Sequence, residues 1–88
     1  MRMLSNLLEK FIKKGSLRFY DASGQLHVFG GKESGPAATA RLHDAALERK
    51  LFTNPELYAA EAYMDGKLTF EEGSGVHDFL MLFSVNRQ

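Results

Sequence analysis

One domain is all that 88 residues allow, and a hydrophobic fraction of 44% with seven phenylalanines supplies a core, which excludes global disorder. The absence of cysteine excludes disulfides and thiolate metal sites, and eleven basic residues against eleven acidic ones exclude a net charge that would attract nucleic acid. No segment approaches the roughly 20 apolar residues of a membrane span, and Glu9 and Lys10 interrupt the N-terminal apolar run that a signal peptide needs, so we expect a cytoplasmic, single-domain protein.

An amphipathic helix is predicted over residues 4–12. Its apolar side chains recur at the spacing of a single helical stripe, at Leu4, Leu7, Leu8, Phe11 and Ile12. Gly15 supplies the stop, after basic residues that suit the negative end of the helix dipole. Two interpretations stay open: the stripe faces the core, or, with basic side chains beside it, it contacts a membrane surface or a lipid.

A β-hairpin comes next, with strands at 17–20 and 26–29 that are rich in aromatic and branched residues. The turn between them offers a side-chain acceptor at Asp21 and a glycine that tolerates a positive φ. Alternation places Val28 on one face of the second strand and turns His27 the other way, as a half-exposed strand histidine.

Residues 30–36 are predicted to form a flexible turn. They contain three glycines and a lysine, but neither the G-x-x-x-x-G-K-[ST] nor the G-x-G-x-x-G spacing of a phosphate-binding loop. A third strand is predicted at 38–42, with Ala38, Ala40 and Leu42 on its inner face. Small side chains there would let a helix pack closely.

Helices are predicted at 45–52, at 55–65 and from 76 into the 80s. A short strand is predicted at 67–70. Asp44 is expected to cap the first of these helices. Asn54 and Pro55 form the start of the second, and Gly66 ends it. We therefore expect an α+β fold in which a small antiparallel sheet, a hairpin plus one or two short strands, is packed by about four helices.

The last helix has apolar side chains on nearly every side, at Val76, Phe79, Leu80, Met81, Leu82 and Phe83. Such a helix needs neighbours around most of its surface, which a domain of this size has trouble supplying. We therefore expect the chain to be the opening domain of a longer protein or to pair with another chain.

No residue is assigned a catalytic, cofactor-binding or metal-binding role. The three histidines are far apart, and none belongs to an H-x-x-x-H or H-E-x-x-H motif. The most informative segment is 61–66, in which Glu61 and Asp65 share one helix face near a C-terminal end, where both their mutual repulsion and the helix dipole disfavour them. This segment is either a helix cap, with Glu61 paired to a Lys or Arg elsewhere, or a polar cluster that faces a partner domain or a ligand.

Several segments between residues 15 and 86 follow the order found in one protein family. They are Gly15-Ser16-Leu17, Gly24, Phe29-Gly30, Ala40-Arg41-Leu42-His43-Asp44, Asn54-Pro55-Glu56-Leu57, Glu61-Ala62-Tyr63-Met64-Asp65-Gly66, Phe79-Leu80 and Asn86. With them the chain resembles the N-terminal domain of cyclopropane-fatty-acyl-phospholipid synthases, which are S-adenosylmethionine-dependent methyltransferases. The hexapeptide at 61–66 is the most specific piece. The chain departs from the family at Ala60, where a glycine is usual, and at Lys67-Leu68-Thr69, where Glu-Trp and an acidic run are usual.

The resemblance implies an accessory role. The parent enzyme would transfer a methylene from S-adenosylmethionine to unsaturated acyl chains of phospholipids. The glycine-rich loop that binds this cofactor is not among these residues, so the resemblance implies no cofactor in this segment and S-adenosylmethionine in the parent. Residues 1–88 would form a single N-terminal domain that presents lipid to the C-terminal methyltransferase domain or packs on it.

Two sets of candidate contact residues follow from the resemblance and the stripes. Glu61, Tyr63 and Asp65 are candidates for contacts at the domain interface or at a lipid site. The candidate lipid or partner surface consists of Leu4, Leu8, Phe11, Phe79 and Phe83. Contact with a phospholipid membrane surface, a peripheral position at the inner membrane, and dimerisation stay open, as does the question of enzymatic activity. The alternative function is a free-standing, non-enzymatic lipid-binding or dimerisation module.

Overall fold

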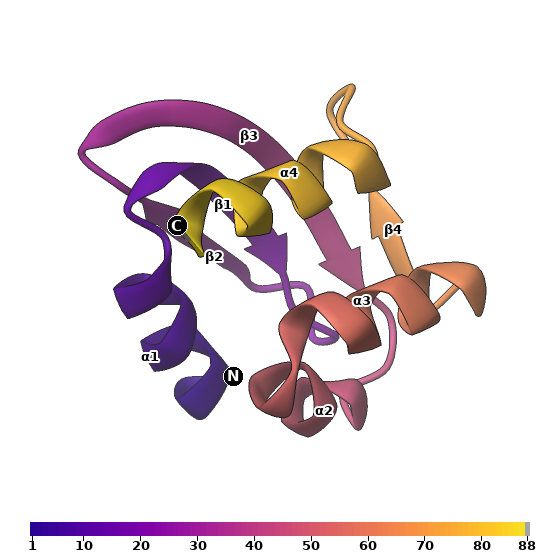
Figure 1. Ribbon diagram of the computed structural model, residues 1–88. Coiled ribbons are helices and arrows are strands. Elements are labelled where there is room, and N and C mark those ends of the chain that lie inside the picture. The colour runs from indigo at the N-terminus through magenta and orange to yellow at the C-terminus, as the bar shows by residue number, and fades with distance from the viewer. Residues whose placement is uncertain (88) are drawn as a thin grey trace.

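The computed structural model describes residues 1–87 and contains, within that range, four helices and one four-stranded sheet (Figure 1). The elements are, in chain order, α1 (Arg2–Phe11), β1 (Lys14–Tyr20), β2 (Leu26–Gly30), β3 (Glu33–Leu42), α2 (Leu47–Thr53), α3 (Pro55–Met64), β4 (Leu68–Phe70) and α4 (Val76–Asn86). The predicted α+β fold class is confirmed. No helix among the described residues is both long and apolar enough to cross a membrane.

The sheet has the strand order β2-β1-β3-β4 and is mixed rather than antiparallel. β1 pairs antiparallel with β2, and β3 pairs antiparallel with β4. β1 and β3, however, run parallel, with Phe19 beside Ala40. The expected antiparallel sheet is therefore wrong for this pair of strands, and β1 lies between β2 and β3 as an inner strand.

A two-residue link between β2 and β3 produces the parallel pair. It crosses the chain just before β1, where the Glu33 N–H donates to the Lys13 carbonyl at 3.3 Å. A Cβ atom at position 31 would lie 1.6 Å from the Lys13 carbonyl oxygen, so only glycine fits at Gly31. The flexible turn predicted over residues 30–36 is therefore wrong: the segment contains this close crossing and the first residues of β3.

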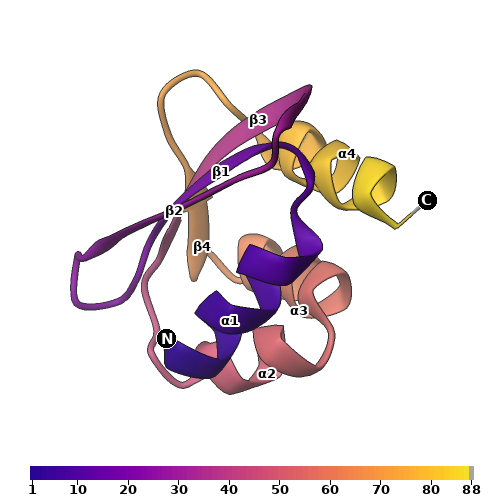
Figure 2. The same cartoon turned by 90° about the vertical axis from the view of Figure 1, so that its left-hand side faces the viewer.

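All four helices lie on one face of the sheet, and the other face is open (Figure 2). The largest fully buried side chains come from both layers: Leu17, Phe19, Leu42, Leu68, Leu82 and Phe83. Ala38 and Ala40 are buried on the inner face of β3, as predicted. Their small side chains let α4 pack closely on β3 and β1.

The hairpin has the predicted alternation of side chains, but the core takes the face of β2 that carries its histidine. Phe19 is opposite His27 in the register, so both side chains lie on the helix-covered face. Leu26 and Val28 lie on the open face, and Val28 is 61% exposed. The His27 ring is hydrogen-bonded at 2.7 Å to the carboxylate of Asp21, which is itself buried.

A side-chain cap explains where α3 begins but not where α2 begins. The Asn54 side chain accepts from the Leu57 N–H at 3.3 Å, and Pro55 occupies the first turn, so α3 begins as predicted. Asp44 does not cap a helix that starts at residue 45. Its carboxylate accepts from the Ala46 N–H at 3.0 Å within a turn, and α2 begins only after that turn.

The end of α4 is attached to the start of β1 through a single side chain. The Asn86 Oδ1 accepts from the Lys13 N–H at 2.7 Å and from the Lys14 N–H at 2.9 Å. Its Nδ2 donates to the carbonyls of Lys14 at 2.9 Å and Leu82 at 2.8 Å. This amide therefore closes backbone groups of β1 that no neighbouring strand satisfies, and it fixes the position of α4 along the sheet.

Candidate functional site

Residues 61–66, which we call the α3 turn, form a fixed helix end. The Lys67 N–H donates to the Ala62 carbonyl at 2.8 Å, and the Gly66 N–H donates to the Tyr63 carbonyl at 3.1 Å. These two bonds define a Schellman motif, which needs a residue in the left-handed region, and Gly66 has φ +74°. The predicted glycine terminator is confirmed, and the side chains of the turn project from a rigid backbone.

The α3 turn presents carboxylates and apolar side chains together at the surface. Glu61 and Asp65 are exposed, and neither carboxylate has a hydrogen bond or an ion pair within residues 1–87. The expected pairing of Glu61 with a Lys or Arg is therefore not seen. Between the two, Met64 is 84% exposed and Tyr63 is 45% exposed. Sequence reasoning selected Tyr63 and both carboxylates but not Met64, although the same hexapeptide contains it.

An aromatic series connects the α3 turn to the core. The Tyr63 ring lies 5.6 Å from the Phe70 ring, centroid to centroid, and Phe70 lies 5.6 Å from Phe79. Phe79 stacks on Phe83 at 4.7 Å, and Phe83 lies 5.1 Å from Phe11. Tilted and offset pairs at these separations are favourable beyond the area that they bury. The two candidate sets named from the sequence are thus in physical contact, through a residue of β4 that belonged to neither.

The apolar candidate set lies inside the domain. The residues Leu4, Leu8, Phe79 and Phe83 are each at most 3% exposed, and Phe11 is half-buried. The interpretation in which the helix stripe faces the core is the one that the structure shows. The cavity beside these residues has a volume of about 10 Å³, about enough for one water molecule and too small for an acyl chain. These side chains therefore offer no exposed lipid surface in this structure.

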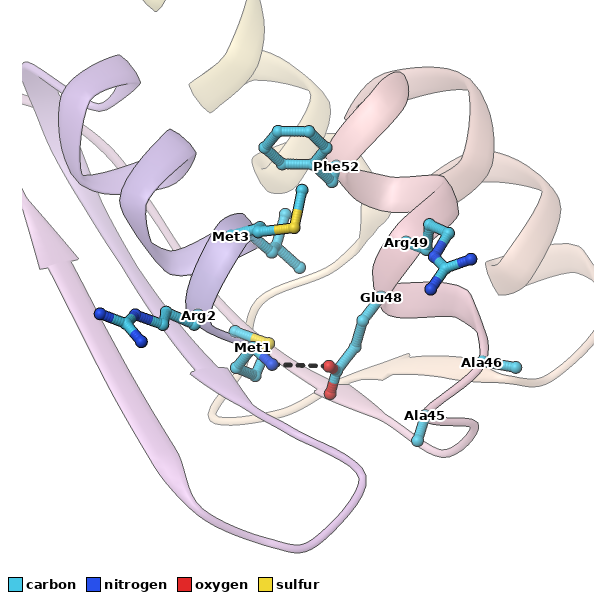
Figure 3. A pocket seen from close by; sticks show the side chains of 9 residues that line it. Met1, Arg2, Met3, Ala45, Ala46, Glu48, Arg49 and Phe52 are labelled. Carbon is cyan, nitrogen blue, oxygen red and sulfur yellow. Dashed lines mark hydrogen bonds and ion pairs between the residues drawn. The ribbon is translucent and has the colours of Figure 1, made fainter.

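A surface groove lies between the start of α1 and α2 (Figure 3). Its volume is about 530 Å³, and its lining consists of Met1, Arg2, Met3, Leu4, Ala45, Ala46, Glu48, Arg49 and Phe52. The amino group of Met1 is paired with the Glu48 carboxylate at 2.7 Å, so the free charges of the groove are the two guanidinium groups. Sequence reasoning missed this groove because its walls come from helices that are distant in the chain.

The open face of the sheet carries paired charges. The Arg41 guanidinium donates to the Glu71 carboxylate and lies 4.2 Å above the centre of the Tyr20 ring. The bond from Arg41 holds the pKa of Glu71 below its usual value. Arg18 lies 3.6 Å from the Glu72 carboxylate. Both arginines of this face are thus engaged by carboxylates from the segment after β4, so the face is not a bare cationic surface.

The hairpin turn contains the most deeply buried carboxylate that the structure describes. Asp21 accepts from the Ser23 hydroxyl at 2.6 Å, and from the N–H groups of Ser23 and Gln25 at 3.0 Å each. Bonds from Ser23 and from His27 hold the pKa of Asp21 well below its usual value. All these partners lie within six residues of it, so the arrangement shapes the turn and leaves no open position for a substrate.

The described residues hold no group of three His, Cys, Asp or Glu side chains close enough together to bind a metal ion. What remains is a fixed helix end with exposed apolar and acidic side chains, and a groove with an apolar lining and two cations. Comparison with known proteins adds no identity: no family model, curated protein or solved structure matches the chain.

Proposed function

We propose that this chain is the non-catalytic N-terminal accessory domain of an enzyme that resembles cyclopropane-fatty-acyl-phospholipid synthase, and that it packs on the C-terminal methyltransferase domain through the α3 turn. One observation carries the proposal: the segment with the most specific family resemblance is also a rigid, exposed turn with Met64 84% exposed. Met and Tyr are enriched at protein interfaces, and a methionine so exposed gains about 1.5–3 kcal/mol when a partner buries it.

The charges of the turn specify the partner's chemistry. Glu61 and Asp65 flank the apolar pair and have no cation within residues 1–87. A partner surface with an apolar recess and a basic rim would bury the methionine and pair with the carboxylates. Rim charges of this kind set orientation and association rate more than affinity. The enzyme's own catalytic domain is the partner that the family resemblance implies.

The proposal is tested in the full-length enzyme. Met64→Ser combined with Glu61→Lys should weaken the contact between the two domains, which limited proteolysis reports as faster cleavage between them and an activity assay reports as slower methylene transfer. Glu9→Lys, an exposed charge reversal on α1, is the matched control and should change neither. Unchanged cleavage and unchanged activity in the double variant would contradict the proposal.

The isolated chain gives a second test. Because the proposal places S-adenosylmethionine in the other domain, titration calorimetry of residues 1–88 with this cofactor should show no binding. Saturable binding would mean that the domain has a cofactor site of its own, and the accessory role would have to be abandoned.

The groove between α1 and α2 favours the alternative, a free-standing lipid-binding module. Its apolar lining includes Phe52 and Met3, which is 62% exposed, and its free charges are Arg2 and Arg49. Such a groove suits an amphiphile with an anionic head group. Co-sedimentation with vesicles of phosphatidylglycerol and phosphatidylcholine distinguishes the two functions. Binding that Met3→Asp abolishes and Met64→Ser preserves would favour the module, whereas no binding would exclude it.

A further inference from the structure

The outer edge of the sheet at β2 has backbone groups that are free to pair. The Asp21 N–H donates to the Gln25 carbonyl at 2.9 Å, and the Gly31 N–H donates to the Gly15 carbonyl at 3.0 Å. These two bonds show which residues bond across the hairpin, because along an antiparallel strand the backbone groups point alternately toward the partner strand and away from it. The odd-numbered residues of β2 therefore bond to β1, and the even-numbered ones point their N–H and C=O groups away from it.

The even-numbered residues of β2 are Leu26, Val28 and Gly30. None of their backbone groups has a hydrogen-bond partner within residues 1–87. Val28 is 61% exposed and Gly30 is also exposed, so these groups are accessible to another chain. The strand thus presents three N–H donors and three C=O acceptors along one open line.

This edge lacks the devices that usually prevent strand pairing. Edge strands are normally blunted by lysine, proline, a bulge or a very short length. The sequence Leu26-His27-Val28-Phe29-Gly30 contains none of these, and its one ionisable side chain turns inward to Asp21. The opposite edge differs, because β4 has only three residues and is followed by Glu71 and Glu72. On that side β3 also has no strand partner before Ala40, but this part of β3 contains Pro36, which blunts an edge.

We propose that β2 pairs antiparallel with β2 of a second copy of this chain, about a two-fold axis through Val28. In that register Val28 is opposite its own copy and Leu26 is opposite Gly30, so every free N–H meets a free C=O. The strand contains no Asp, Glu, Lys or Arg, and its histidine ring is turned inward to Asp21, so self-pairing places no like charges opposite each other. The two exposed valines meet on the open face of a continuous eight-stranded sheet.

A second copy fits this edge because the three free residues are placed symmetrically about Val28 and the strand contains no Asp, Glu, Lys or Arg that would meet its own copy. An axis through His27 would still pair Leu26 with Val28, but it would place Gly30 opposite Gly24 of the turn, whose N–H already donates to the Asp21 carbonyl, so Gly30 would lack a full pair. The interface is one strand wide, so the dimer is weak and concentration-dependent. It also leaves the α3 turn free, since that turn lies by β4 at the other end of the sheet.

Sedimentation equilibrium from 10 µM to 1 mM tests the pairing (about the range in which weak interfaces populate dimers). The wild-type chain should show a monomer–dimer equilibrium, and Val28→Thr, which keeps the branched side chain, should keep it. Val28→Lys places two ammonium groups opposite each other and should be monomeric throughout. A wild-type chain that stays monomeric at the highest concentration, or a lysine variant that dimerises equally well, would overturn the proposal.

Amide hydrogen exchange identifies the surface that pairs. With rising concentration, the amides of Leu26, Val28 and Gly30 should become protected, while those of His27 and Phe29 should be protected already in the monomer. Dimerisation without this alternation would place the interface elsewhere and refute the β2 edge. Val28→Pro is the second variant: its lost N–H points away from β1, so the hairpin should fold while the dimer is lost. Because the α3 turn stays uncovered, this result is independent of the proposed contact with a catalytic domain.

Discussion

Replacing Asp21 by alanine should cost this domain a large part of its stability. Asp21 is 7% exposed, and its carboxylate accepts from the Ser23 hydroxyl, from two backbone N–H groups and from the His27 ring. Alanine would remove the acceptor of the Ser23 and Gln25 N–H groups and the partner of the His27 ring, whose side chain is 18% exposed. Hydrogen bonds to a charged group contribute about 1.5–3 kcal/mol each but do not add in full, so we expect a loss of about 3 kcal/mol.

A loss of this size is a large part of the domain's total free energy of unfolding. At about 0.05–0.15 kcal/mol per residue, a domain of this length has a free energy of unfolding of roughly 4–13 kcal/mol. A loss of 3 kcal/mol corresponds to a fall in Tm of about 12–24 °C. Asp21→Asn is the matched variant. Its amide oxygen keeps the bonds from Ser23 and Gln25, and its amide nitrogen can donate to His27, so it should lose only about 1 kcal/mol.

The pH dependence gives an independent check of the same carboxylate. The pKa of Asp21 is lowered in the folded state, so its stabilisation is fully present above the pKa of about 3.9 of an unfolded aspartate and is lost as the pH falls through the folded pKa. Urea unfolding from pH 5 to pH 2 should therefore show the full difference in unfolding free energy between wild type and Asp21→Asn at about pH 5. Below about pH 4 the difference in unfolding free energy between wild type and Asp21→Asn should narrow and then vanish or reverse in sign.

Two results would refute this reasoning. One is a loss below 1 kcal/mol for Asp21→Ala, which would mean that the turn is set by its glycine and backbone alone. The other is a gap between wild type and Asp21→Asn that does not change on acidification, which would mean that the carboxylate has the same proton affinity in the folded and the unfolded chain.

Three further substitutions test the crossing, the attachment of α4 and the end of α3 by urea unfolding. Gly31→Ala should lose more than about 3 kcal/mol of unfolding free energy or fail to fold, because its Cβ meets the Lys13 backbone. Gly30→Ala is the control and should be tolerated, because the nearest atom to its Cβ is 3.9 Å away. Equal losses in the two variants would contradict the close crossing. Asn86→Ala should lose about 2–3 kcal/mol, and Asn86→Asp at least as much, because a carboxylate oxygen would then face the Lys14 and Leu82 carbonyls to which the amide nitrogen donates; a neutral alanine variant would show that the amide is dispensable. Gly66→Ala has open space around it, so its loss should be the backbone strain alone, about 1–2 kcal/mol, and a larger loss would imply a clash that the structure does not have.

The sequence predicted the features that depend on residues close together in the chain, such as helix ends. The start of α3 follows from Asn54 and Pro55, and its end follows from Gly66, because each signal acts on backbone groups within a few residues. The stripe of the first helix predicted an amphipathic element for the same reason, and of its two open interpretations the structure shows the core-facing one. Asp44 shows the limit of such signals, since an aspartate bonds as readily to a turn as to a helix, and here it does the former.

The features that the sequence did not predict depend on contacts between residues that are far apart in the chain. The parallel pairing of β1 and β3 depends on how closely Gly31 approaches Lys13, and no periodicity records that distance. The core takes the β2 face that carries Phe29 and His27, where Asp21 gives the histidine ring a partner, although the other face carries Leu26 and Val28. For the candidate site, the hexapeptide pointed to the correct turn, but the exposure of Met64 and the groove beside α2 required the packed helices.

Asn86 joins parts of the chain that a ribosome makes far apart in time. Its amide satisfies the first backbone groups of β1, 72 positions earlier than itself, and α4 covers the middle of the sheet. A nascent chain that has produced all four strands still lacks the helix that buries Leu17 and Phe19 and the side chain that closes the sheet's inner strand. We therefore expect the domain to remain open to chaperones and proteases during synthesis until α4 has emerged, and to close in one step at that point.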